Sequence, residues 1–171
     1  MPISNHKKLN FIIRKNKGVH KLKQYKQFFI NLNLEDLEYI DLEQSDDITG
    51  SIDDIFPFIM PDYEIIEGNS EIKDSRLLTE ILYSSNNDDF CYIFIDDVDE
   101  CGMFKAKTIS ALNHCLSATK LSFEKTFFLT DSAFKFSFRI NYYNEECTED
   151  KDKFDIQRQM QEKKLKNEFK I

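Results

Sequence analysis

The stretch Phe90-Cys-Tyr-Ile-Phe-Ile95 decides the fold, because it is a continuous apolar run with a pair of Asp residues on either side. A short run that is rich in aromatic and β-branched residues favours a strand buried on both faces over a helix. We therefore expect residues 90–95 to form the central strand of a sheet.

A hairpin is expected downstream of this strand. Residues 126–130 are mostly apolar, the pair Asp131-Ser132 favours a turn, and residues 134–142 alternate between apolar and polar side chains. Such alternation is typical of a strand with one buried face. The buried face is predicted to carry Phe134, Phe136, Phe138, Ile140 and Tyr142.

Apolar residues recur at spacings of three and four in other segments, and this period predicts helices. The predicted helices cover residues 19–32, 74–84 and 106–119. The charged segment 150–171 is predicted to form a further helix that lies on the surface.

Two short strands are expected over residues 9–14 and 63–67, from their apolar content. Residues 45–54 are rich in Asp, Ser and Gly, which favour turns, so we expect a loop there.

Together these elements predict a single α+β domain over residues 1–171. The length of 171 residues and the hydrophobic content of 41% fit one core of ordinary size. We expect a mixed, mainly antiparallel sheet of about four to six strands, with a C-terminal hairpin and a cover of about three to four helices.

Charge is distributed unevenly along the chain. Residues 1–28 hold eight basic residues and no acid, whereas residues 29–102 hold 21 acids and two basic residues, for a net charge of −19. The remaining residues carry +3, and the whole chain carries −8. Two interpretations follow. Either the basic N-terminal arm, residues 1–17 above all, neutralises the acidic middle, or the excess of acid steers a basic macromolecule.

The four cysteines, at positions 91, 101, 115 and 147, lack the close spacing of a secreted disulfide scaffold. The sequence shows no apolar run long enough to span a bilayer, and we expect no signal peptide. We therefore expect reduced thiols in a cytoplasmic protein that does not bind a membrane.

Residues 92–100, an apolar run followed by acids, look like the Walker B strand of AAA-type ATPases. The chain has no Gly-rich loop ending in Lys, which nucleotide hydrolysis also needs, and its Cys and His spacing matches no zinc site. We expect no cofactor, no metal site and no catalytic residue. A small metal-dependent hydrolase that uses Asp97 and Asp99 is kept as an alternative.

Paired acids recur through the acidic middle of the chain, at positions 46–47, 53–54, 88–89, 96–97 and 99–100. In this feature and in overall composition, the chain resembles the immunity proteins of bacterial contact-dependent and other polymorphic toxin systems. The resemblance implies a basic protein partner, a nuclease-type toxin domain, whose active cleft the acidic surface covers. It implies no particular fold.

The expected partner-binding residues are these acids and an apolar segment stiffened by Pro57 and Pro61. Phe58 fits an interface anchor and a core plug equally well. The full set is Asp46, Asp47, Asp53, Asp54, Phe58, Asp62, Tyr63, Asp88, Asp89, Asp96, Asp97, Asp99 and Glu100.

Two other binding roles stay open, a nucleic-acid mimic and an adaptor subunit of a larger complex. Direct nucleic-acid binding is not expected, because the acidic surface repels phosphate. The sequence leaves the oligomeric state open.

Overall fold

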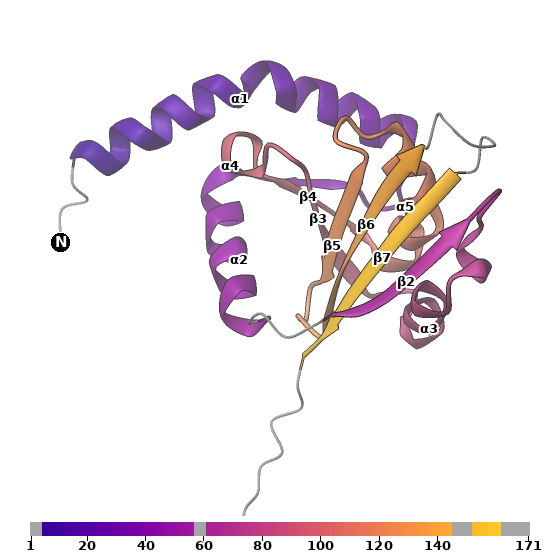
Figure 1. Cartoon of the computed structure of the whole chain (residues 1–171). Helices are drawn as coiled ribbons and strands as arrows, with labels where there is room; N and C mark the ends of the chain where they lie inside the picture. Colours follow the sequence, from indigo (N-terminus) through magenta and orange to yellow (C-terminus); the bar gives the residue numbers. More distant parts are fainter. Residues whose placement is uncertain (1–4, 57–60, 145–151, 162–171) are drawn as a thin grey trace, which may run out of the picture.

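A seven-stranded sheet in the order β1-β4-β3-β5-β6-β7-β2 forms the centre of the computed structural model, which describes residues 5–56, 61–144 and 152–161 (Figure 1). Every neighbouring pair of these strands is antiparallel, so the sheet is not the mixed one that was expected. The strands are β1 (Glu38–Ile40), β2 (Asp62–Glu67), β3 (Phe90–Phe94), β4 (Met103–Lys107), β5 (Thr126–Asp131), β6 (Phe136–Asn144) and β7 (Asp152–Met160).

Helices α3 and α5 cover one face of the sheet, and α1 passes over one end of it (Figure 1). The α-helices of the described ranges are α1 (Asn5–Asn31), α2 (Leu42–Ile55), α3 (Arg76–Ser84), α4 (Val98–Cys101) and α5 (Thr108–Leu121), and the short 3₁₀ helix η1 is Ile72–Asp74. This arrangement confirms the α+β class. The sheet has more strands than expected, because three segments for which no strand was expected, 38–40, 103–107 and 152–160, join it.

The core lies between the sheet and helices α3 and α5. Ile93 of β3 and Leu129 of β5 are fully buried in it. Strand β3 lies in the interior of the sheet, between β4 and β5, as expected. Its burial alternates, however, because α3 and α5 pack against a single face. Cys91 and Ile93 are buried, whereas Tyr92 and Phe94 are partly exposed, so the expectation of a strand buried on both faces is wrong.

The hairpin over residues 126–142 is confirmed as β5 and β6. Its register pairs Phe127 with Ile140 and Leu129 with Phe138, and all four side chains are buried. Asp131 closes the turn, because its carboxylate accepts the backbone N–H groups of Lys135 and Phe136 at 2.5 and 3.0 Å.

Phe134 does not lie on the buried face of this hairpin. It precedes β6 with a φ of 54°, in the left-handed region that the turn requires. Its ring stacks on Tyr92 with centroids 6.1 Å apart, and Tyr92 lies on the opposite face of the sheet. The expected alternation therefore begins at Phe136.

Three predicted helices and one predicted strand are confirmed. Residues 19–31 form the second half of α1, and residues 76–84 of the predicted 74–84 form α3. Of the predicted 106–119, residues 108–119 belong to α5, whereas residues 106 and 107 are the end of β4. Strand β2 contains residues 63–67.

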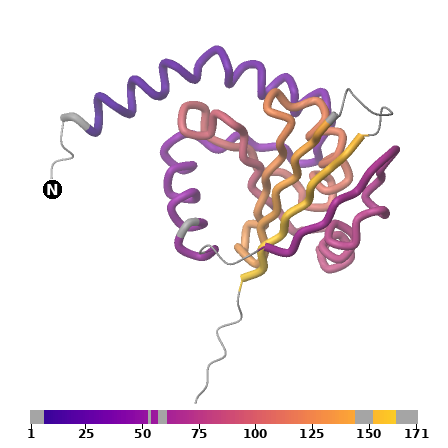
Figure 2. The backbone as a smooth tube through the Cα atoms, in the orientation of Figure 1, coloured from indigo at the N-terminus to yellow at the C-terminus, as the bar shows by residue number. Residues whose placement is uncertain are grey.

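Residues 9–14 belong to α1, so the short strand expected there is wrong. The helix is continuous over 27 residues, and its N-terminal part reaches beyond the sheet (Figure 2). Phe11 and Arg14 are half-buried, whereas Ile12 is exposed. Helix propensities of β-branched residues are weak preferences that a surrounding helix overrides. The basic arm 1–17 is thus, from residue 5 onward, the beginning of this helix.

Residues 45–54 form most of α2, so the loop expected there is wrong. The carboxylate of Asp41 caps the helix by accepting two backbone N–H groups at 3.0 and 3.1 Å. Leu42, Ser45 and Ile52 are buried on one side of it. The Asp and Ser residues of 45–54 lie inside the helix, and the cap at Asp41 together with the burial of Leu42 and Ile52 outweighs their preference for turns.

Residues 152–160 form strand β7, so the C-terminal helix expected over 150–171 is wrong in this part. Phe154 and Ile156 alternate with polar residues and are fully buried, and β7 pairs with β6 along nine residues. Pairing on both sides, with β6 and β2, outweighs the weak helical pattern of the charged residues. Residues 162–171 lie outside the described residues.

Candidate functional site

Helix α1 lies directly on α4 just beyond the C-terminal end of β3. Gly18 of α1 is buried at this contact, and a Cβ atom here would stand 2.0 Å from the carbonyl oxygen of Glu100. The thiol of Cys101 donates to the carbonyl oxygen of Gly18 at 3.4 Å. Because glycine has no Cβ, the backbones of the two helices can approach this closely.

Charged side chains fix α1 on either side of Gly18. The ammonium of Lys21 lies 2.5 Å from the carboxylate of Asp97 and 3.1 Å from that of Glu100, and the Tyr25 hydroxyl donates to Asp97 at 3.0 Å. These bonds to Asp97 and then to Glu100 raise the pKa of Lys21. Burial, followed by the bond to Asp97, raises the pKa of Tyr25. Asp97 and Glu100 are therefore engaged within the chain.

Arg14 forms a second clamp, between α1 and α2. Its guanidinium makes two bonds to the carboxylate of Asp46, at 2.6 and 3.0 Å, and its Nε donates to the carbonyl oxygen of Asp99 at 2.6 Å. Bidentate pairs of this kind fix orientation as well as distance. Part of the basic helix thus neutralises part of the acidic middle, which is the first of the two interpretations of the charge pattern.

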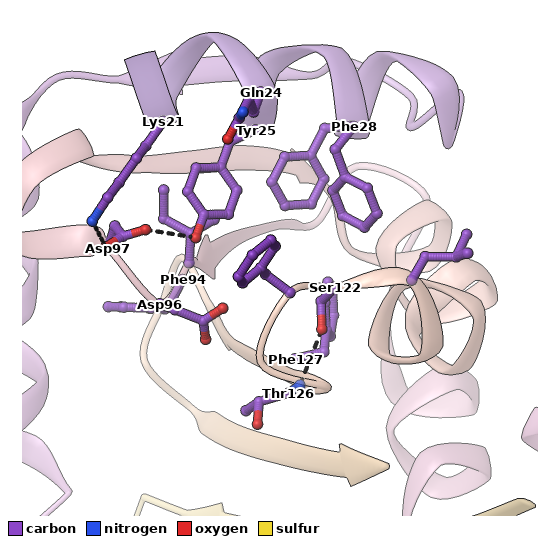
Figure 3. Close-up of a pocket in the computed structure, with 14 residues that line it drawn as sticks. Lys21, Gln24, Tyr25, Phe28, Phe94, Asp96, Asp97, Ser122, Thr126 and Phe127 are labelled. Carbon is purple, nitrogen blue, oxygen red and sulfur yellow. Dashed lines mark hydrogen bonds and ion pairs between the residues drawn. The ribbon is translucent and has the colours of Figure 1, made fainter. Parts of the chain in front are cut away.

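An apolar pocket lies beside this contact, under α1 (Figure 3). It has a volume of about 240 Å³ and is enclosed by α1, the end of β3 and the segment 121–127. Figure 3 shows Tyr25 and Phe28 reaching down from α1 toward Phe94 and Phe127.

Asp96 stands at the mouth of this pocket, exposed to solvent on one side. Burial of its other side raises the pKa of Asp96, and the carboxylates of Glu124 and Asp97 raise it further, whereas a hydrogen bond from the backbone of Glu124 opposes them. No cation in the described ranges forms an ion pair with Asp96. A second hollow, of about 470 Å³, begins on the other side of Asp96 and is bordered by Glu124 and Arg139.

One exposed face of α2 carries a row of acids, which we call the α2 acidic stripe: Glu43, Asp47 and Asp54. All three are exposed, and their spacing of four and seven residues places them on one helix face. None forms an ion pair with a described residue. Near the start of α2, Glu43 and Asp47 also border an open hollow whose other wall, on α1, carries Lys7 and Lys8.

The remaining predicted binding residues do not form one surface with these. Asp88 and Asp89 precede β3 and Asp96 follows it, so they lie at opposite ends of that strand. The carboxylate of Asp88 lies 3.5 Å from the ammonium of Lys107, and that of Asp89 accepts the backbone N–H of Asn86 at 2.8 Å.

Asp62 and Tyr63 belong to β2, at the edge of the sheet. Asp62 pairs with Arg158 at 2.8 Å, and Tyr63 is 52% exposed. Phe58 lies outside the described residues, and the side chain of Asp53 is likewise not described.

The described residues contain no group of three or more His, Cys, Asp or Glu side chains placed to hold a metal ion. In the hydrolase alternative, Asp97 would have to give up its bonds to Lys21 and Tyr25 before it could bind a metal ion. The three described cysteines are free and buried.

Sequence reasoning missed two parts of this site, the contact at Gly18 and the apolar pocket. A signal for the pocket was present: Leu121 and Phe123 interrupt a polar segment just after the predicted helix 106–119. In the structure they are 67% and 91% exposed at the pocket rim.

None of the helices in the described ranges is long and apolar enough to cross a membrane. A scan against protein-family models, a search of curated proteins and a search of solved structures each gave no match to this chain.

Proposed function

We propose that this chain is a protein-binding module that covers a basic surface of one partner protein with the α2 acidic stripe. In the same proposal, the partner is a nuclease-type toxin domain and the chain is its cytoplasmic immunity protein. The binding role is supported by the structure of α2, and the toxin class by the resemblance in composition.

The observation that carries the proposal is the exposure of Glu43, Asp47 and Asp54 on one face of α2 without a cation partner in the described ranges. Like charges along a helix repel one another, which destabilises the isolated helix. A basic partner would relieve this repulsion and would be attracted to the stripe over a distance of about 10 Å.

The structure of α2 also supports a rigid presentation of the stripe. Leu42 and Ile52 are buried on its inner side, and the pair between Arg14 and Asp46 ties it to α1. A surface that is held in place before binding loses less entropy on association than a mobile one.

The binding surface differs from the one expected from the paired acids alone. Asp46, Asp97 and Glu100 are engaged by basic residues of α1, so they contribute less attraction to a partner than their number implies. The proposal therefore narrows the contact from the whole set of paired acids to one exposed face of α2, which includes Asp47 and Asp54 of that set and adds Glu43. A nucleic-acid mimic would use the same face but would bind many DNA-binding proteins. An adaptor would also use this face but would bind within one fixed assembly.

The test is affinity capture from the source cells with three baits. The first is the unaltered protein, and the second carries Glu43→Lys, Asp47→Lys and Asp54→Lys. The third is a matched control with the same change of charge, Glu35→Lys, Glu67→Lys and Asp88→Lys, at exposed acids away from α2. Melting temperatures establish that all three baits are folded.

We expect the unaltered bait and the control to retain the same basic protein in a stoichiometric complex, and the α2 variant to lose it. Retention by all three baits, or loss with both variants, would overturn the assignment to α2. A protein without a basic surface as the retained partner would overturn the proposed function itself.

A further inference from the structure

The apolar pocket under α1 is not used by the proposed function, because none of the residues that line it belongs to α2. Its rim carries Leu121 and Phe123, which are 67% and 91% exposed. Covering an aromatic side chain that is almost entirely in water with an apolar ligand lowers the free energy, because apolar surface is removed from water. The pocket thus offers apolar area that no described residue covers.

The pocket has room for a small organic molecule. An engineered protein cavity of about 150 Å³ accommodates benzene. The volume of about 240 Å³ here is sufficient for one aromatic ring and a short alkyl chain. The side chains of Phe28, Phe94 and Phe127 provide the apolar walls against which such a group packs.

The charges at the mouth favour a cation over an anion or a neutral group. Asp96 faces into the mouth, with Asp97 and Glu124 as its acidic neighbours. Lys21, the one cation among the described residues that line the pocket, is bound to Asp97 and Glu100, and Arg139 borders the adjoining hollow instead. The mouth therefore carries an excess of negative charge next to an apolar interior, and aromatic faces attract cations as well.

We propose that this pocket binds a small organic cation, a primary ammonium on an aryl-alkyl chain, with the chain between Phe28, Phe94 and Phe127 and the ammonium on Asp96. The ammonium supplies the counter-charge that Asp96 lacks among the described residues. The aryl-alkyl chain of the ligand replaces water at the exposed rim of the pocket.

The probe is 4-phenylbutylamine, and binding to the full chain is measured by isothermal titration calorimetry near neutral pH. Two analogues of the same length are compared with it, 4-phenylbutan-1-ol, which is neutral, and 4-phenylbutyrate, which is an anion. We expect the amine to bind about tenfold more tightly than the alcohol, because a hydrogen bond to a charged group is stronger than a neutral one. The anion should bind most weakly.

Three variants locate the binding. Asp96→Asn should weaken the amine about tenfold and leave the alcohol within about twofold. Phe123→Ala should weaken both, and because Phe123 is exposed the substitution should leave the fold intact. Asp88→Asn, at the other end of β3, is the matched control and should change neither.

Absence of amine binding at millimolar concentration would overturn the proposal, as would equal affinity for amine and anion or an amine affinity that Asp96→Asn leaves unchanged. The variant with a reversed α2 acidic stripe should still bind the amine. A failure of the amine-binding proposal can therefore be distinguished from a failure of the proposed function.

Discussion

Gly18 of α1 and Glu100 of α4 touch through their backbones: a Cβ atom on Gly18 would stand 2.0 Å from the Glu100 carbonyl oxygen. A real Cβ cannot approach backbone this closely, so any larger residue at position 18 must push α1 away from α4. The pairs made by Arg14 and Lys21 on either side of Gly18 depend on the same approach.

Gly18→Ala should therefore destabilise the protein by about 1 to 3 kcal/mol. The matched control is Gly50→Ala, because Gly50 also lies within a helix but a Cβ there would have nothing within 4 Å. The control should stabilise by up to about 1 kcal/mol through helix propensity. Denaturant unfolding measures both. Equal effects of the two substitutions would contradict the close contact of α1 with α4.

Asp96→Asn should raise the melting temperature at neutral pH. Burial on one side and the carboxylates of Glu124 and Asp97 raise the pKa of Asp96 in the folded state, so its charge is unfavourable there. A carboxyl with a raised folded pKa costs stability as pH rises through that pKa, and costs nothing below its unfolded value of about 4.

The gain from Asp96→Asn should consequently disappear in acid. Lys21 and Arg139 also lie near, but neither forms an ion pair with Asp96. Thermal melts between about pH 3 and pH 7 test the prediction, with Asp88→Asn as control. A lower melting temperature of Asp96→Asn at neutral pH would show instead that the charge is stabilised in the folded protein.

Glu64→Gln should destabilise the protein by about 1 kcal/mol at neutral pH, allowing for partial solvent screening. The Glu64 carboxylate accepts the backbone N–H groups of Arg76 and Leu77 at the start of α3, and also the Ser75 hydroxyl. Burial alone would raise its pKa, but these bonds outweigh burial and lower the pKa of Glu64.

A lowered folded pKa contributes stability above the unfolded value, and this is lost as pH falls through the folded pKa. The difference between Glu64→Gln and the unaltered protein should therefore shrink in acid. Glu67→Gln, an exposed acid on the same strand, serves as control. A deficit for Glu64→Gln that persists unchanged at low pH would rule out the charged carboxylate as its cause.

The three described cysteines should resist alkylation in the folded protein. Burial raises the pKa of Cys91 and of Cys115 to about 12, and that of Cys101 to about 11. The thiolate is the reactive form, and access is blocked as well. Pulse labelling with iodoacetamide at about pH 8, read peptide by peptide by mass spectrometry, should modify them only after unfolding. Fast labelling of Cys101 in the folded state would show that α1 opens from α4.

The sequence was sufficient for elements whose pattern is local. The apolar run at 90–94 and the alternation after Phe136 each carry their own signal within a few residues. Strand β7 was missed because its signal is short: Phe154 and Ile156 are isolated among charged residues, and only pairing with β6 and β2 makes a strand of them. Helix α2 was missed because Asp and Ser favour turns when judged locally, whereas here they lie inside a helix that Asp41 caps and whose Leu42 and Ile52 are buried.

The candidate site was less accessible to sequence reasoning, because its contacts join distant segments. Lys21 and Asp97 are 76 positions apart, and nothing local indicates that the two would pair. Counting charges by segment gave the correct excess of acid but could not show which acids are engaged. The structure separates the engaged carboxylates of Asp97 and Glu100 from the α2 acidic stripe, which forms no ion pair with a described residue.

The salt dependence of association with the captured partner tests the binding role of the α2 acidic stripe most directly. For the unaltered chain, we predict an association rate that falls at least about tenfold between low salt and about 0.5 M, with a dissociation rate that changes much less. The variant with Glu43, Asp47 and Asp54 changed to Lys should associate slowly at low salt and show little salt dependence. The same steep dependence in both proteins would contradict a role for the stripe in binding.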